Sequence, residues 1–215
     1  MYEYILFDLD GTLTDPREGI TKSVQHALRG MDIEEPDLTA LEHFIGPPLY
    51  DEFIRCYGFD DGGAKRAVSL YRERFSVIGW RENLLFDGVH ELLSALKRSG
   101  KRLAIASSKP TVFVEKILDL FAIACYFDAV SGASLDGVIS RKEQVVAQAL
   151  SMLGVTDKSA AVLVGDRFHD VEGAHRNGIA CVGVTFGFGG LEELSHAGAD
   201  HIAATMDELF GVLCR

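Results

Sequence analysis

The stretch Tyr4-Ile5-Leu6-Phe7-Asp8-Leu9-Asp10-Gly11-Thr12 begins as a short apolar run and ends in polar groups. A bounded run of this length that is rich in aliphatic and aromatic residues predicts a buried β-strand. Asp8 and Asp10 alternate with Leu9, so on an extended chain their carboxylates point the same way. Two carboxylates this close repel each other unless a cation or a proton lies between them. The end of this first strand is therefore a candidate cation site.

Residues 15–82 follow this strand and carry helical periodicity without a strand pattern. Apolar residues recur every three or four positions in three segments, and a glycine closes each of them. The three glycines are Gly30, Gly58 and Gly79. The segment therefore predicts a run of helices, which the chain inserts directly after its first strand.

From residue 83 onward, short apolar runs alternate with helical patterns. The expected strands cover residues 103–106, 127–130, 161–164 and 180–184. Such alternation predicts parallel βαβ units, and continuous apolar strands are typical of sheets covered on both faces. We therefore expect an α/β fold with a doubly wound parallel, Rossmann-like sheet. Residues 1–14 and 83–215 would form this core, and residues 15–82 would form an inserted small all-helical domain.

Ligands of open α/β sheets bind beyond the carboxyl ends of the strands, so the residues that follow each strand matter most. The second strand leads into Ser107-Ser108-Lys109-Pro110, and the strand at 161–164 leads into a segment with Asp166 and Asp170. Carboxylates, hydroxyls and a cation thus gather at one edge. A hard cation with oxygen ligands, most simply Mg2+, relieves the repulsion. One carboxylate could then act as nucleophile and another as general acid and base.

Two of these features have structural interpretations as well. Ser107 or Ser108 could be the N-cap of a helix with Pro110 in its first turn, an arrangement that is compatible with anion binding at the helix N-terminus. Lys109 and Lys142 are candidates for balancing phosphate charge, although a lone lysine is more typical of a solvated surface.

Taken together, the pieces resemble the haloacid dehalogenase superfamily of phosphohydrolases over nearly the whole chain. Asp8–Leu13 resembles the first motif, DxDGT, and Gly165–Asp170 resembles the fourth, GDxxxD. Ser107 stands where the second motif places a hydroxyl residue. Lys142 stands where a lysine is expected before the fourth motif, with Arg141 as its competitor.

The resemblance implies a mechanism. Asp8 would attack phosphorus and form an aspartyl-phosphate, and Asp10 would serve as the general acid and base. Mg2+ would be held by Asp8, Asp10 through its backbone carbonyl, and Asp166, with Asp170 supporting. The implied phosphate-binding residues are Ser107, Ser108, Lys142, Gly11 and Thr12.

The helical segment resembles the small cap of that superfamily, and Phe44-Ile45-Gly46-Pro47-Pro48-Leu49 resembles its form in phosphoglycolate phosphatase-like members. This implies a Mg2+-dependent phosphomonoesterase of that kind. The alternatives are a 5′-nucleotidase, a sugar phosphomutase and, outside enzymes, a receiver-like domain with a phosphorylated aspartate. Arg17, Tyr71 and Arg72 are candidates for substrate specificity, although Tyr71 lies on an apolar stripe that suits packing equally well.

The 215 residues carry 21 Lys and Arg against 32 Asp and Glu, a net charge of −11. Such a chain repels nucleic acid and anionic lipid, so we expect neither as a main partner. The resemblance implies a small phosphorylated metabolite as partner, and we expect a monomer or homodimer. Four cysteines without metal-ligand spacing predict reduced thiols. The N-terminus has no signal-peptide pattern and no run is long enough to span a membrane, so we expect a cytoplasmic location.

Overall fold

The computed structural model describes residues 2–214. The chain divides into two compact units. One unit, the core, contains the chain up to Thr14 and from Leu85 onward, and the other, the helical unit, is Asp15–Leu84. The first strand of the core is thus separated in sequence from every other strand of its sheet.

The core is built on a six-stranded sheet in which all neighbouring strands are parallel. The strand order is β5 (Ala129–Ala133), β4 (Arg102–Pro110), β1 (Tyr4–Phe7), β6 (Ala161–Gly165), β7 (Ala180–Val184) and β8 (His201–Ala203). β1 pairs on both sides, with Phe7 opposite Ile105 of β4 and Val164 of β6. The expected α/β fold with a doubly wound parallel sheet is confirmed.

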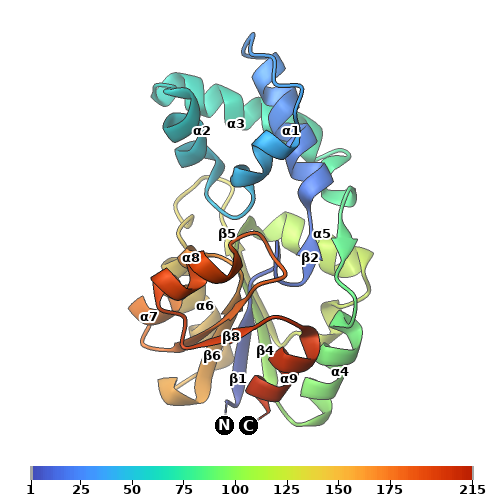
Figure 1. The fold of residues 1–215 in the computed structure, drawn as a ribbon, viewed down its shortest axis with the longest axis vertical. Coiled ribbons are helices and arrows are strands. Elements are labelled where there is room, and N and C mark those ends of the chain that lie inside the picture. Colours follow the sequence, from blue (N-terminus) through green and yellow to red (C-terminus); the bar gives the residue numbers. More distant parts are fainter. Residues whose placement is uncertain (1, 215) are drawn as a thin grey trace. The chain divides into compact units, whose positions relative to one another are not determined.

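Helices cover both faces of the sheet, as Figure 1 shows. On one face lie α6 (Lys142–Leu153), α7 (Phe168–Arg176) and α8 (Gly190–Ala197), and on the other α4 (Val89–Arg98), α5 (Thr111–Leu120) and α9 (Met206–Leu213). Beneath α6 and α7 the buried core includes Leu6, Ala104, Leu163, Val146 and Val171. Because apolar side chains occupy both faces, the polar residues that follow the strands meet at the carboxyl edge of the sheet.

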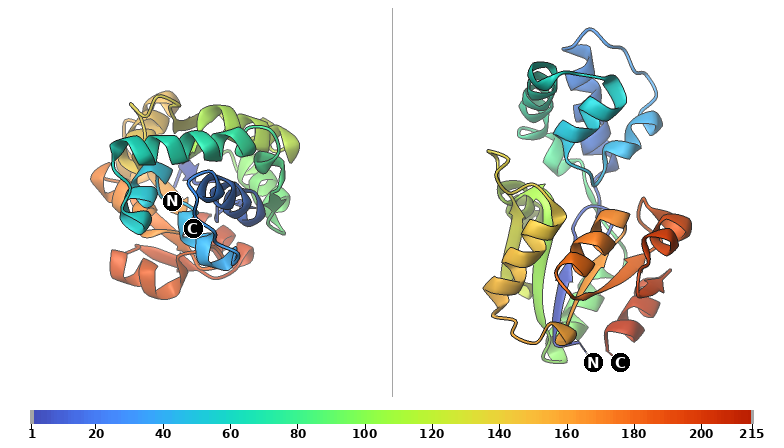
Figure 2. Two further views of the ribbon diagram at one scale, coloured as in Figure 1. Left: turned by 90° about the horizontal axis from the view of Figure 1, so that it is seen from above. Right: turned by 90° about the vertical axis from the view of Figure 1, so that its left-hand side faces the viewer.

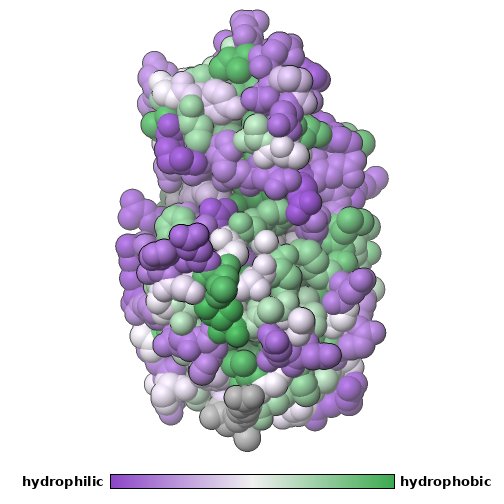
Figure 3. All heavy atoms as spheres, viewed as in Figure 1, coloured by the Kyte–Doolittle hydropathy of each residue, from purple (hydrophilic) through white to green (hydrophobic). Residues whose placement is uncertain are grey.

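The helical unit contains α1 (Arg17–Arg29), α2 (Leu49–Tyr57) and α3 (Asp61–Phe75), with short 3-10 segments η1 (Thr39–Phe44) and η2 (Gly79–Arg81). Both α1 and α2 pack against α3, and the unit can be followed in Figure 2. Phe44 and Phe53 pack with their ring centres 4.9 Å apart and join η1 to α2. Hydrophilic side chains cover much of the unit on the face shown in Figure 3.

Several local features differ from the sequence-based expectations. β4 continues to Pro110, so Ser107 and Ser108 lie within the strand and the N-cap interpretation is wrong. The strand carries them because it pairs with β5 as far as Pro110, with a register shift after Ser107. Two short strands that the sequence did not predict, β2 (Thr14–Asp15) and β3 (Leu84–Leu85), pair with each other. Within residues 2–214, no helix has the length and apolar composition needed to cross a membrane.

Candidate active site

Three buried carboxylates gather at the carboxyl edge of the core sheet. Asp8 directly follows β1, Asp166 follows β6, and Asp170 lies in the first turn of α7. Their side chains each offer an oxygen, and these oxygens lie within 4.8 Å of one another. All three residues are at most 5% exposed. Parallel pairing of β1 with β6 brings Asp8 to the other two residues, although it lies about 160 positions before them in the sequence.

A lysine ammonium lies between two of these carboxylates. Lys142 Nζ is 2.9 Å from Asp8 Oδ1 and 2.7 Å from Asp170 Oδ1, and it donates a hydrogen bond of 3.0 Å to the Ala106 carbonyl. Burial opposes the charge on Lys142, but the Asp170 and Asp8 carboxylates outweigh it and raise the pKa of the ammonium above its usual range. Lys142 therefore stays charged. Arg141, its competitor by sequence, is exposed at the start of α6.

Asp10 has a different partner from Asp8. Its Oδ2 accepts a hydrogen bond from Lys109 Nζ, and both residues are at most 8% exposed. Burial raises the pKa of the Asp10 carboxyl, while Lys109 opposes that rise. Ser107 Oγ accepts a hydrogen bond of 3.3 Å from the Lys109 backbone N–H. The sequence suggests Lys109 as a cation but gives no sign of its pairing with Asp10, because the two come together only through the pairing of β1 with β4.

The loop after β1 is shaped by its contact with Asp166. Gly11 has φ +81°, and a Cβ atom there would lie 2.1 Å from Asp166 Oδ2. Asp166 Oδ2 also accepts a 2.7 Å hydrogen bond from the Phe188 backbone N–H, and Thr12 Oγ1 lies 3.5 Å from Asp166 Oδ1. The Gly11 and Thr12 backbone N–H groups donate within the loop itself, to carbonyls of Thr14 and Leu9.

The charge balance of this edge fits a hard cation. Asp8 and Asp170 share one ammonium, with the Asp166 carboxylate beside them, and burial raises the pKa of Asp166 and raises that of Asp170 to about 6. Among the described residues, Asp10 Oδ1 has no hydrogen-bond partner. The Oδ1 atoms of Asp8 and Asp170 form ion pairs with Lys142 Nζ, but the angles of these contacts do not suit hydrogen bonds. Carboxylate oxygens are ligands that Mg2+ prefers, and buried ones without full hydrogen bonding have capacity left for an ion, so these residues fit the expected cation.

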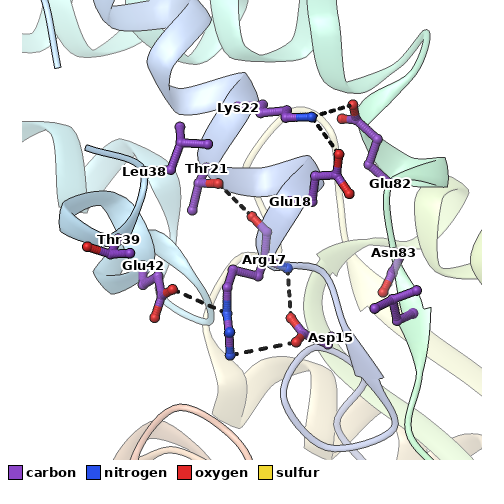
Figure 4. A pocket seen from close by; sticks show the side chains of 11 residues that line it. Asp15, Arg17, Glu18, Thr21, Lys22, Leu38, Thr39, Glu42, Glu82 and Asn83 are labelled. Carbon is purple, nitrogen blue, oxygen red and sulfur yellow. Dashed lines mark hydrogen bonds and ion pairs between the residues drawn. The ribbon is translucent and has the colours of Figure 1, made fainter. Parts of the chain in front are cut away.

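The residues expected to set specificity lie in the helical unit. Arg17 lines a cavity of about 400 Å³ there and makes ion pairs with Asp15 at 3.6 Å and Glu42 at 3.2 Å (Figure 4). Tyr71 is buried on α3, with its ring stacked 5.1 Å from that of Phe75, and Arg72 follows it on the same helix. Ser108 is half-buried on β4 of the core.

Comparison with known families decides the class of this site. The profile of the haloacid dehalogenase-like hydrolases matches residues 5–184, which include Asp8, Lys142 and Asp170. The chain belongs to the haloacid dehalogenase-like hydrolase family. The resemblance seen in the sequence is thereby confirmed, and with it the expected enzyme class, a phosphatase of this family.

Relatives of this hydrolase carry several activities in their names. A protein of Pseudomonas aeruginosa called a 5′-nucleotidase is 50% identical over 99% of this chain and 96% of its own length. The Mycobacterium tuberculosis protein called tyrosine-protein kinase PtkA is 40% identical over 96% of this chain and 71% of its own. A Colwellia psychrerythraea phosphoglycolate phosphatase is 28% identical over 96% and 95%. The crystal structure of a predicted phosphatase from Clostridium acetobutylicum superposes with a TM-score of 0.97 at 48% identity, over 100% of this chain and 99% of that one.

Proposed function

We propose that this hydrolase is a Mg2+-dependent phosphomonoesterase that works through an aspartyl-phosphate on Asp8. The observation that supports this most strongly is the buried group of Asp8, Asp166 and Asp170, two of which contact the ammonium of Lys142. Mg2+ would be held by Asp8, Asp166 and the main-chain carbonyl of Asp10, with Asp170 supporting. When bound, the ion supplies positive charge that neutralises phosphoryl oxygens.

The chain's own residues account for both half-reactions. A carboxylate oxygen of Asp8 attacks phosphorus, the bond from phosphorus to the leaving oxygen breaks, and Asp10 gives that oxygen a proton. Asp10 then takes a proton from water, which attacks the acyl phosphate, releases inorganic phosphate and restores the Asp8 carboxylate. Lys142 stays charged beside Asp8, so it can bind phosphoryl oxygens as negative charge develops on them.

The remaining candidates for the phosphate site have two different roles: some donate hydrogen bonds to the phosphoryl group, and others fix the conformation of the loop after β1. We propose Ser107 as a second donor to the phosphoryl group, with Ser108 as a neighbouring candidate on the same strand. Gly11 and Thr12 already use their backbone N–H groups inside the loop. We therefore propose that these two contribute by holding the loop against Asp166, where a larger residue than glycine would not fit.

We propose nucleoside 5′-monophosphates as the favoured substrate class and phosphoglycolate as the second. This order reverses the one that the sequence motifs suggest. It rests on the relative called a 5′-nucleotidase, at 50% identity, against 28% for the phosphoglycolate phosphatase. Arg17, Tyr71 and Arg72 of the helical unit remain the candidate specificity residues, and a monomer or homodimer remains the expected assembly.

The test is phosphate release from a panel of 5′-nucleotides, phosphoglycolate and sugar phosphates, with and without Mg2+. We expect Mg2+-dependent release that favours 5′-nucleotides and that Asp8→Asn abolishes. Asp119→Asn, an exposed acid on α5, is the matched control and should keep full activity. Full turnover by Asp8→Asn would exclude this nucleophile.

Other phosphoryl-transfer activities give different products in the same assay. A sugar phosphomutase would isomerise a sugar phosphate without releasing phosphate, and a receiver-like domain would keep a stable phosphoryl-aspartate after treatment with an acyl phosphate. Because one relative is named a tyrosine-protein kinase, the assay includes an additional reaction in which ATP and a tyrosine-containing peptide are supplied. Phosphotyrosine formation without phosphomonoester hydrolysis would replace the proposed function with that of a kinase.

A further inference from the structure

A second cluster of metal-ligating side chains lies in the helical unit. His43 belongs to η1, and Glu52 and Cys56 belong to α2. Glu52 and Cys56 are four positions apart, so they share one face of the helix. An imidazole nitrogen, a carboxylate oxygen and the thiol sulfur of these residues lie within 4.8 Å of one another. The active-site proposal uses none of the three residues.

The imidazole of His43 is held in the form that binds metals. Its Nδ1 lies 2.8 Å from the Ala40 carbonyl, which can only accept, so Nδ1 carries the proton. In the neutral ring Nε2 then has a free lone pair. Among the described residues, this buried Nε2 has no hydrogen-bond partner. A buried polar atom of this kind needs an explanation, and a bound ion is one of the recognised explanations.

The other two groups are already spaced as ligands of one ion would be. The Cys56 thiol donates to Glu52 Oε2 with a sulfur–oxygen separation of 3.5 Å. Tetrahedral zinc, with bonds of about 2.3 Å to sulfur and about 2.0 Å to oxygen, places two such ligands about 3.5 Å apart. The cluster can reach solvent because Cys56 is exposed, and the ring of Phe44 packs against that of His43 with the ring centres 4.6 Å apart.

Glu52 already has a cationic partner. Arg55 Nη2 lies 2.6 Å from Glu52 Oε2, and Arg55 Nε lies 3.1 Å from Oε1. The Arg55 side chain is 63% exposed, so it can turn into water, and a bound cation would then neutralise the buried Glu52 carboxylate in its place. A carboxylate also has about four lone-pair positions, so Glu52 can ligate an ion through one oxygen and keep Arg55 on the other.

We propose that His43, Glu52 and Cys56 bind a borderline divalent transition-metal ion such as Zn2+, at a site separate from the acidic cluster of the core. Nitrogen and sulfur ligands favour such ions over Mg2+ and Ca2+. Three protein ligands leave a fourth position for water. Because the ligands come from η1 and α2, the ion joins these two elements and stabilises the helical unit.

The test uses the full-length protein stripped of metal with a chelator and held in excess Mg2+, which occupies the acidic cluster. Co2+ is titrated in, since a thiolate ligand gives a sulfur-to-cobalt charge-transfer absorption that carboxylates do not give. We expect this absorption in the wild type, its loss on competition with Zn2+, and its loss in Cys56→Ser. Cys125→Ser, which changes another exposed cysteine, is the matched control and should keep it.

His43→Gln provides an independent measurement. We expect Zn2+ binding, measured by calorimetry under the same conditions, to weaken about ten-fold or more. Circular dichroism checks that each variant is folded. Absence of the charge-transfer absorption in the wild type, its survival in Cys56→Ser or its loss in Cys125→Ser would each overturn the proposal.

Discussion

Gly11 lies so close to Asp166 that a Cβ atom on the glycine would stand 2.1 Å from the carboxylate Oδ2. The backbone of the loop after β1 thus occupies the space that a side chain would need. The DxDGT motif requires its glycine here for two reasons, the left-handed φ of +81° and this close approach.

The two reasons can be separated by a pair of substitutions. Gly137 has φ +80°, and a Cβ atom there would meet nothing within 4 Å. We expect Gly137→Ala to lose about 1–2 kcal/mol of unfolding free energy from backbone strain, with activity unchanged. Gly11→Ala should lose more stability and about a hundred-fold or more in kcat/KM, because Asp166 must move. Urea unfolding and phosphate release measure both. Equal losses in the two variants would show that the contact with Asp166 is unimportant.

Lys142 allows a test of the charge balance in the acidic cluster. Lys142→Met keeps most of the side-chain volume but leaves Asp8 and Asp170 buried without their cation. We expect the free energy of unfolding to fall by about 3–5 kcal/mol and activity to be lost. We also expect Mg2+ to raise the Tm of the variant more than that of the wild type, because the cluster has gained net negative charge. A variant with wild-type stability in Mg2+-free buffer would contradict this account.

Asp128 has a structural role at the opposite edge of the sheet. Its Oδ2 accepts hydrogen bonds of 2.8 Å from the Leu103 backbone N–H and from Lys97 Nζ. Asp128→Ala leaves the Leu103 N–H without this acceptor, and we expect a loss of about 1–3 kcal/mol of unfolding free energy with unchanged kcat/KM. Chemical denaturation and the phosphatase assay provide the two measurements, with Asp119→Ala as the exposed control. A fall in kcat/KM at full stability would argue against a purely structural role.

Stability of the helical unit should depend on pH through Glu82. Arg74 donates hydrogen bonds of 2.7 and 2.8 Å to its two carboxylate oxygens, and this pairing lowers the pKa of Glu82. A carboxyl whose pKa is lower in the folded state stabilises that state above its unfolded pKa of about 4.3. This contribution disappears as the pH falls through the folded pKa. We expect Glu82→Gln to lower the free energy of unfolding at pH 7. Below about pH 4, the difference in unfolding free energy between the variant and the wild type should become smaller. Urea unfolding measures both proteins across this range, and a difference in unfolding free energy that stays constant from pH 7 to pH 3 would contradict this expectation.

Much of the fold and the acidic cluster can be predicted from the sequence, because both follow from local patterns. Apolar runs that end in Asp8 and Asp166 place two carboxylates at one sheet edge once parallel pairing is assumed. Ser107 and Ser108 were expected near a helix start, and they lie in the strand instead. The reason is tertiary, since β4 continues only because β5 pairs with it up to Pro110.

Contacts between side chains from distant elements could not be predicted. The pair of Lys109 and Asp10 forms where the end of β4 meets the loop after β1, and no spacing pattern encodes that meeting. The same is true of His43, which joins Glu52 and Cys56 only through the packing of η1 on α2. The four-residue spacing of Glu52 and Cys56 on one helix predicts that these two are neighbours, but it gives no information on His43.

The central position of β1 has a consequence for how the protein is made. Tyr4 pairs with Arg102 on one side and with Ala161 on the other, partners that lie 98 and 157 positions further along the chain. Ribosomes deliver the N-terminus first, so Ile5, Leu6 and Phe7 emerge long before either neighbouring strand exists to cover them. Contacts of such long range slow folding, and apolar segments stay exposed to solvent until the contacts form. Nascent chains that end before residue 161 are therefore expected to rely on chaperones, and to aggregate without them.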